Sequence, residues 1–251
     1  MEILRASKIT VIIALLGIFL SCKSAMQVIP VDPAFNCAAS QVDQESLSVL
    51  DTVVIDNVDS TDIVVNLKWY ITYDSLTEQL PNFDQEIASS MERLNEDWQG
   101  TIRFSYDTIQ YYIHNRRDID YYRGNLELER SELRNLYNEE GSISVFILPT
   151  NNNLLGYARL LTSWHDGYAV SEPSLDFVMV SRDGLRSVHD WSSEKGSSTL
   201  THEIGHFFSL DHAFDNCINY MSYNCYRSEF TAEQLEQMLR FLITYRSYLI
   251  Q

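Results

Sequence analysis

The segment Thr199-Leu-Thr-His-Glu-Ile-Gly-His-Phe-Phe-Ser-Leu-Asp-His212 decides the fold of this chain. His202 and His206 are four residues apart, so on a helix both imidazoles project from one face toward a single cation. Glu203 follows the first histidine, where its carboxylate can face a water molecule on the metal without ligating the metal. His212 is too far beyond His206 to share that face of a straight helix, so the chain must turn to bring it round as a third ligand.

Three neutral nitrogen ligands with one open position are typical of a catalytic zinc site, whereas a structural site closes its fourth position with another protein ligand. The segment therefore predicts one catalytic Zn2+ ion. Glu203 is the candidate general base, which would take a proton from the attacking water and return it to the leaving amine. The alternative is a helix whose histidines are ordinary surface or core residues.

Outward from this segment, the apolar pattern predicts a layered structure of strands and helices. Runs of β-branched and aromatic residues predict strands at 62–73, 101–106, 142–148 and 176–181, with a short edge strand at 156–161. Apolar residues at helical spacing predict helices at 83–98 and 126–140, each followed by a glycine. Thr231 and Gln234 form a capping-box pattern, which predicts where the last helix begins.

The first 21 residues predict a secretory signal peptide. A basic start precedes the apolar run Ile9–Leu20 and the small residue Ser21, which is the usual order in such a signal. The run is shorter than the about 20 residues of a spanning helix, although a membrane anchor or a buried helix is the alternative. Phe19-Leu20-Ser21-Cys22 resembles a bacterial lipobox, which implies cleavage before Cys22 and lipid modification of that cysteine. The chain is then an exported lipoprotein anchored to a bacterial membrane, on its periplasmic or cell-surface side, or a secreted protein.

The charge balance limits the classes of molecule that the chain can bind. The chain has 18 Lys and Arg against 35 Asp and Glu, a net charge of −17, which becomes −18 once residues 1–21 are removed. Nucleic acid is bound by clustered basic side chains, so we expect no nucleic acid partner and no docking on anionic lipid by charge. We divide the chain into a signal peptide at 1–21, a tether or pro-segment at 22–60, and a catalytic domain at 61–251.

Three cysteines remain after the signal peptide and its lipidation site. In an oxidising compartment Cys217 and Cys225, which are close in the sequence, are the natural disulfide pair. Cys37 is then left over. It is free, exchanges into another pairing, or blocks the zinc from a pro-segment as a fourth ligand.

The zinc segment and the residues after it resemble the metzincin metallopeptidases, and most closely the pappalysin family. The metzincin motif HExxHxxGxxH is followed by a turn that contains methionine, here Asn219-Tyr-Met-Ser-Tyr223. Phe230-Thr-Ala-Glu-Gln234 and the predicted strands from Ile143 onward extend the likeness over roughly residues 141–242. The resemblance implies an α+β, metzincin-like zincin domain: a mixed twisted sheet with an active-site helix, a Met-turn and a C-terminal helix.

The resemblance also implies roles for individual residues. His202, His206 and His212 would be the zinc ligands, Glu203 the general base and Met221 the hydrophobic floor beneath the metal. Tyr223 matches a tyrosine that can stabilise the oxyanion of the tetrahedral intermediate, and its alternative role is that of a packed core residue.

Three departures from the family pattern matter. Ser209 stands where the motif has glycine, so we expect a turn that differs or is strained by roughly 1 kcal/mol. The stretch between His212 and Met221 is short, and Asp211 and Asp215 alone do not support a calcium site. Cys217 lies just before the Met-turn rather than farther upstream, so the family's disulfide is not transferred.

Together these features predict an exported, lipid-anchored zinc endopeptidase that acts on a protein or peptide bound along an edge strand. One alternative is an inactive zinc-binding lipoprotein that serves as a binding or adhesion module, although such a module would not need Glu203. The other alternative is a zinc hydrolase of a non-peptide amide.

Overall fold

The computed structural model describes residues 36–38, 63–73, 79–98, 100, 102–113, 141–148, 154–158, 177–186, 197–213, 218–222 and 227–251. All of them belong to one compact unit, Pro33–Gln251. Several sequence predictions fall outside the described residues: the signal peptide, the lipidation site Cys22, the helix at 126–140, Asp215, Tyr223, and the pair Cys217 and Cys225. Within the described ranges, no helix has the length and apolar character needed to cross a membrane.

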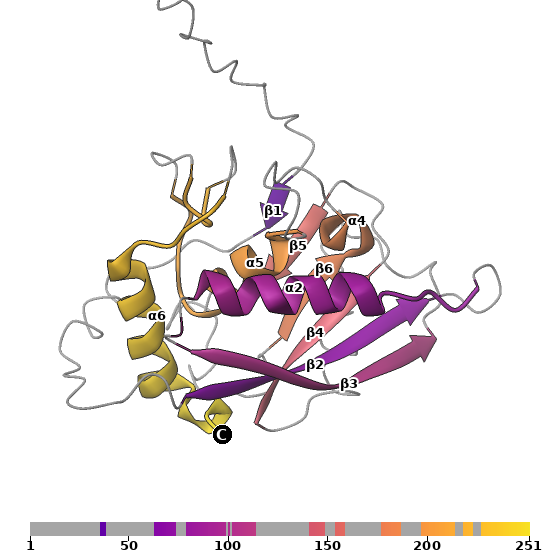
Figure 1. Ribbon diagram of the computed structural model, residues 1–251, viewed down its shortest axis with the longest axis horizontal. Helices are drawn as coiled ribbons and strands as arrows, with labels where there is room; N and C mark the ends of the chain where they lie inside the picture. Colours follow the sequence, from indigo (N-terminus) through magenta and orange to yellow (C-terminus); the bar gives the residue numbers. More distant parts are fainter. Residues whose placement is uncertain are drawn as a thin grey trace, which may run out of the picture. The chain divides into compact units, whose positions relative to one another are not determined.

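Six strands form one mixed sheet in the order β1-β5-β6-β4-β2-β3. Their bounds are β1 Asn36–Ala38, β2 Val64–Tyr73, β3 Arg103–Ile113, β4 Ser142–Leu148, β5 Leu154–Ala158 and β6 Phe177–Ser181. Neighbouring strands are parallel except β5 and β6, which are antiparallel. This confirms the predicted mixed sheet, and it places β5 next to β1 at one end of the sheet (Figure 1).

The helices are α2 Asp84–Asp97, the short α4 Arg182–Leu185, α5 Thr199–Phe207, α6 Ala232–Tyr245 and the 3₁₀ turn η4 Ser247–Leu249. Helices α2, α5 and α6 lie where the sequence predicts them, whereas α4 and the 3₁₀ turn at the C-terminus were not predicted. Helix α5 packs on β5 and β6, and α2 packs on β3 and against α5 (Figure 1). The capping box at the start of α6 is present, with the Thr231 side chain and the Gln234 side chain each bonded to the other residue's backbone.

Three strands differ from the sequence prediction. Strand β5, predicted at the edge of the sheet, is not an edge strand, because β1 pairs with its outer side. Strand β3 continues to Ile113, beyond the predicted end at 106, because it pairs with β2 along its length, from Val64 opposite Arg103 to Tyr73 opposite Ile113. Strand β1 lies within the segment predicted as tether or pro-segment, and it exists through its parallel pairing with β5.

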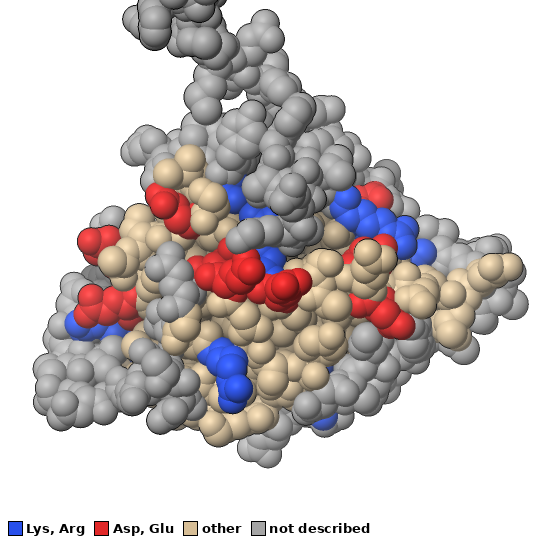
Figure 2. Space-filling view, viewed as in Figure 1, with Lys and Arg blue, Asp and Glu red and all other residues tan. Residues whose placement is uncertain are grey.

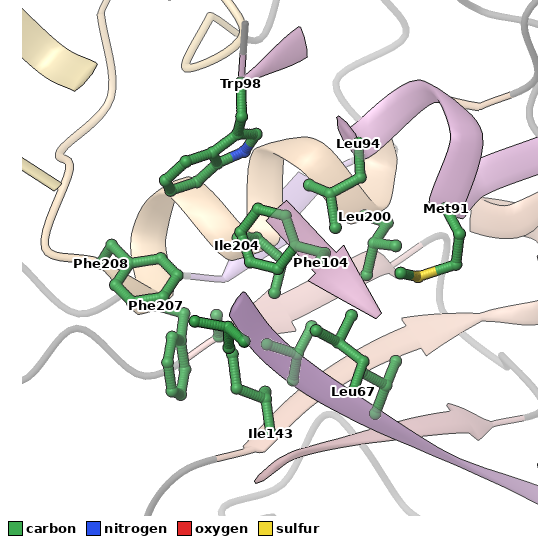
Figure 3. Close-up of a cluster of buried hydrophobic side chains, with 14 of the residues drawn as sticks. Leu67, Met91, Leu94, Trp98, Phe104, Ile143, Leu200, Ile204, Phe207 and Phe208 are labelled. Atoms are coloured by element: carbon green, nitrogen blue, oxygen red, sulfur yellow. The ribbon is translucent and has the colours of Figure 1, made fainter. Parts of the chain in front are cut away.

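The apolar faces of α2, α5 and the sheet share one core (Figure 3). Leu94 of α2, Trp98 directly after this helix, and Leu200 and Ile204 of α5 are fully buried there. The Trp98 ring makes edge-on contacts with Phe104, Phe208 and Phe230 at centroid distances of 4.9, 5.3 and 5.8 Å. Each fully buried side chain of this size contributes about 2 kcal/mol, so the packing holds α5 firmly in place.

The solvent face of α2 is acidic. Asp84, Glu92 and Glu96 are exposed on this helix, and Figure 2 shows acidic side chains gathered on the face of the molecule where α2 lies. This acidic face is in keeping with the net charge of −17.

Candidate metal centre

Helix α5 carries the first two histidines inside the protein. Every residue of this helix is buried, including His202 at 1% exposure and His206 at 0%. The two imidazole Nε2 atoms are 3.1 Å apart, and the rings meet edge to face with their centroids 4.6 Å apart. The four-residue spacing thus brings both side chains to one point, as predicted.

The chain turns sharply after α5 and returns the third histidine to the same point. Ser209 has φ of +74°, so of the two expected outcomes, a different turn or a strained one, the structure has the left-handed, strained turn. The Ser209 N–H donates to the His206 carbonyl at 2.9 Å, and the next N–H, of Leu210, donates to the Gly205 carbonyl at 3.0 Å. These two bonds form a Schellman motif with serine in the glycine position. Beyond the turn, the Nε2 of His212 lies 2.9 Å from that of His206.

Backbone carbonyls orient the two buried imidazoles. The Nδ1 of His202 lies 2.6 Å from the Tyr220 carbonyl oxygen, and the Nδ1 of His206 lies 2.7 Å from the Leu210 carbonyl oxygen. A carbonyl only accepts, so each Nδ1 carries the proton and each Nε2 presents a lone pair. Two such lone pairs 3.1 Å apart repel each other unless a cation lies between them.

The distances between the ligand atoms suit a metal ion. One ligand atom from each of the three histidines lies within 4.8 Å of the other two. Two nitrogen ligands of a tetrahedral zinc ion, each about 2.0–2.1 Å from the metal, lie about 3.3 Å apart. The Nε2 separations of 3.1 and 2.9 Å are close to that value, so the three histidines fit zinc.

The protonation states agree with a ligand role. Burial lowers the pKa of His202 well below its ordinary value, that of His206 to about 3 and that of His212 to about 4. Burial is the largest cause for each residue, and the Arg227 guanidinium lowers the pKa of all three further, whereas the Asp211 carboxylate raises the pKa of His212. All three imidazoles are therefore neutral near pH 7, the form that binds metal.

Glu203 lies between α5 and the strand β5. Its side chain is fully buried and lies directly against the backbone of Gly156. A Cβ atom at Gly156 would be 2.5 Å from Oε1 of Glu203 and 2.6 Å from its Cγ. Gly156 therefore leaves the space that the carboxylate occupies, a role that the sequence pattern did not reveal.

The Met-turn packs against α5 at Gly205, whereas Glu203 of the same helix faces β5. Met221 is fully buried, and a Cβ atom at Gly205 would be 2.5 Å from its sulfur. The Met221 N–H is held by the Asn219 side chain at 2.8 Å, and the Met221 carbonyl accepts from the Ala213 N–H at 3.0 Å. The methionine thus packs closely against α5 at Gly205.

Helix α6 ties the turn after α5 and the Met-turn together. The Gln237 side-chain amide donates to the Ser209 carbonyl at 3.0 Å. The Asn219 side-chain amide donates to Gln234 Oε1 at 2.6 Å. The helix therefore supports two segments of the centre without placing a side chain among the metal-binding atoms.

The other predicted site residues divide into two groups. Asp211 is exposed beside His212, and the backbone of Cys37 belongs to β1. Tyr223, Cys217, Cys225 and Cys22 lie outside the described residues. The three histidines are the one group in the described part of the chain whose side chains could hold a metal ion.

No protein-family model and no curated protein matches the sequence. Solved structures with a similar fold include the following two. Metalloproteinase-II from Bacteroides fragilis shares 14% identity with a TM-score of 0.49, over 78% of this chain and 60% of that one. A zinc-dependent peptidase from Methanocorpusculum labreanum shares 17% identity with a TM-score of 0.39, over 68% of this chain and 99% of that one. This chain therefore spans less than two thirds of the length of the Bacteroides fragilis protein.

Proposed function

We propose that this chain is a zinc metallopeptidase, and more closely an endopeptidase that cuts peptide bonds with an activated water molecule. The observation that carries this proposal is the meeting of three Nε2 atoms, at 3.1 and 2.9 Å, on a helix that also holds a fully buried glutamate. His202, His206 and His212 would hold one zinc ion, and Glu203 would be the general base.

When bound, zinc would polarise the scissile carbonyl and make a water molecule a stronger nucleophile at neutral pH. Glu203 would take the proton from that water on its carboxylate and deliver it to the leaving amine. Its burial excludes bulk water from the proton transfer. The carbonyls of Tyr220 and Leu210 keep the Nδ1 protons of His202 and His206 in place, so that Nε2 stays available.

Glu203 also favours catalysis over an inactive binding module. A fully buried carboxylate costs free energy unless its environment compensates it, so its place beside a metal centre needs a reason. A module that only held zinc would not need a carboxylate at this position. A general base is the reason that the chemistry supplies.

The position of strand β5 beside Glu203 favours a peptide substrate over a non-peptide amide. An extended peptide binds to the edge of a sheet by main-chain hydrogen bonds, and Gly156 of β5 lies against Glu203. The outer edge of β5 carries β1, with Asn36 opposite Leu154 and Ala38 opposite Tyr157. A substrate strand on that edge would take the place of β1, so we assign residues 22–60 as a pro-segment that competes with substrate.

Two substitutions test separately whether β1 competes with the substrate and whether the Cys37 thiol binds zinc. Ala38→Pro removes a backbone donor and weakens pairing with β5, so KM should fall. Cys37→Ser should raise basal activity only if the thiol binds the zinc. Unchanged KM in Ala38→Pro would show that β1 does not compete with substrate.

The remaining roles complete the proposal. Cys22 would carry the lipid that anchors an exported protein to a bacterial membrane, and Cys22→Ser should move the protein from the membrane fraction to the soluble one. Tyr223 would donate to the oxyanion, so Tyr223→Phe should lower kcat by about 10²–10³-fold. Cys217 and Cys225 would form a disulfide across the Met-turn, which mass spectrometry of the unreduced protein would detect.

The central experiment measures zinc content and cleavage of a peptide library in parallel. We expect about one zinc per chain, and loss of cleavage on treatment with a chelator. Glu203→Ala should keep zinc and lose turnover, whereas Glu92→Ala, an exposed glutamate on α2, should match the wild type. Cleavage by Glu203→Ala at the wild-type rate would refute the mechanism.

A further inference from the structure

A buried carboxylate on a different helix connects two segments that flank one of the metal-binding histidines. Asp97 is the last residue of α2, and 8% of it is exposed. Its Oδ2 accepts a hydrogen bond from the Thr201 hydroxyl at 2.9 Å, and its Oδ1 accepts a short one from the Tyr220 hydroxyl. Thr201 directly precedes His202 on α5, and Tyr220 directly precedes Met221.

These contacts close a ring around His202. The Tyr220 carbonyl, on the same residue whose hydroxyl binds Asp97, accepts the Nδ1 proton of His202 at 2.6 Å. The path runs from Asp97 through Thr201 to His202, crosses to Tyr220, and returns through the tyrosine ring to Asp97. Thr201, His202 and Tyr220 are each at most 2% exposed, so water does not compete for these bonds.

Arg93 compensates the buried charge. Its Nε lies 3.4 Å from Asp97 Oδ2, its Nη2 donates to the Arg227 carbonyl at 2.9 Å, and its guanidinium carbon lies 5.6 Å from the centre of the Tyr220 ring. Removing one partner of a buried ion pair costs more than the pair contributes. The side chains of Arg93, Asp97 and Tyr220 are therefore held in fixed positions relative to one another.

We propose that Asp97 is a positioning residue for the metal centre, which sets the direction of the His202 imidazole by holding Thr201 and Tyr220 together. The inference rests on the proposed zinc site. If the Tyr220 hydroxyl or its acceptor is lost, the Tyr220 carbonyl is free to shift away from His202. The Nδ1 proton of His202 is then no longer held on that nitrogen, and the imidazole ring is no longer held in one orientation. Loss of a group that orients a metal ligand in this way lowers metal affinity by about 10–100-fold.

The test compares zinc affinity, measured by competition with a chromogenic chelator, with the thermal stability of the metal-free protein. Tyr220→Phe removes the hydroxyl and keeps the carbonyl, and Asp97→Asn removes the charge and keeps the shape. Thr72→Val is the matched control, because it deletes a buried hydrogen bond to the Ile147 carbonyl (2.9 Å) within the sheet. Replacing zinc by Co2+ adds a visible spectrum that reports the geometry of the ligands.

We expect Tyr220→Phe and Asp97→Asn each to weaken zinc binding at least about tenfold and to alter the cobalt spectrum. Thr72→Val should lower the melting temperature with the zinc affinity and the spectrum unchanged. Wild-type affinity and spectrum in Tyr220→Phe would overturn the proposal, and this variant decides the matter even if Asp97→Asn fails to fold. If the wild-type chain bound no zinc, the proposed function itself would fail, and the inference with it.

Discussion

Gly156→Ala tests whether the carboxylate of Glu203 needs the space beside β5. The backbone of Gly156 is not in the left-handed region, so alanine introduces no backbone strain, and the added Cβ is the whole perturbation. That atom would lie 2.5 Å from Oε1 of Glu203. Ordinary contacts are about 3.5 Å, so the carboxylate must move by about 1 Å. Strand β5 cannot easily yield, because Gly156 is paired with Val180 of β6.

A displacement of about 1 Å at a catalytic group lowers the rate by about 10²-fold, and overpacking a core costs about 1–3 kcal/mol. The assay is kcat on a quenched peptide substrate, with zinc content measured on the same sample. Zinc should remain bound, because the overlap falls on Glu203 and not on the histidines.

A double-mutant cycle with Glu203→Ala isolates the contact. Glu203→Ala removes the atoms that Cβ would overlap, so in that background Gly156→Ala should cost little of the free energy of unfolding. The two residues should therefore couple by about 1–3 kcal/mol in urea denaturation. An equal loss of stability in both backgrounds would refute the role assigned to Gly156, and so would wild-type kcat in Gly156→Ala.

Three further predictions concern the surroundings of the centre. Ser209→Gly should raise the free energy of unfolding by about 0.5–1 kcal/mol, because glycine takes a φ of +74° without strain although it has more freedom when unfolded; a lower melting temperature would contradict this. Thr231→Ala should lower stability by about 1 kcal/mol in urea denaturation, through loss of the bond to the Gln234 N–H at 3.2 Å. In the metal-free protein the histidine pKa values are depressed to about 3 for His206 and about 4 for His212. The stability that these histidines contribute is present above pH about 6.5 and is lost as pH falls toward those values, so a melting temperature constant between pH 7 and 4 would contradict their burial.

The features that could be predicted from the sequence are the local ones. The four-residue spacing of His202 and His206 determines their relative direction on any helix, and Thr231 with Gln234 determines where α6 begins. The likeness to the family motif, which has glycine at the position of Ser209, predicted a turn there that differs or is strained, and the structure has a positive φ at this residue. In each example the relevant atoms are close together in the chain.

The features that could not be predicted depend on contacts between distant segments. Asp97 is 104 residues from Thr201, and at the end of α2 it looks like any polar residue of an amphipathic helix. Gly156 matters because Glu203 arrives from another element. Strand β1 has no β-branched residue and owes its conformation to β5. No pattern of residues along the chain carries such information.

The contacts of helix α6 determine how the metal centre unfolds. Gln237 holds the segment that leads to the third histidine, while Gln234 holds the Asn219 side chain of the Met-turn. The segment before His212 and the Met-turn are thus both held by α6, so neither segment can move away while this helix stays folded. Dissociation of zinc on heating should therefore coincide with melting of the C-terminal helix in a single cooperative step, rather than proceed one ligand at a time.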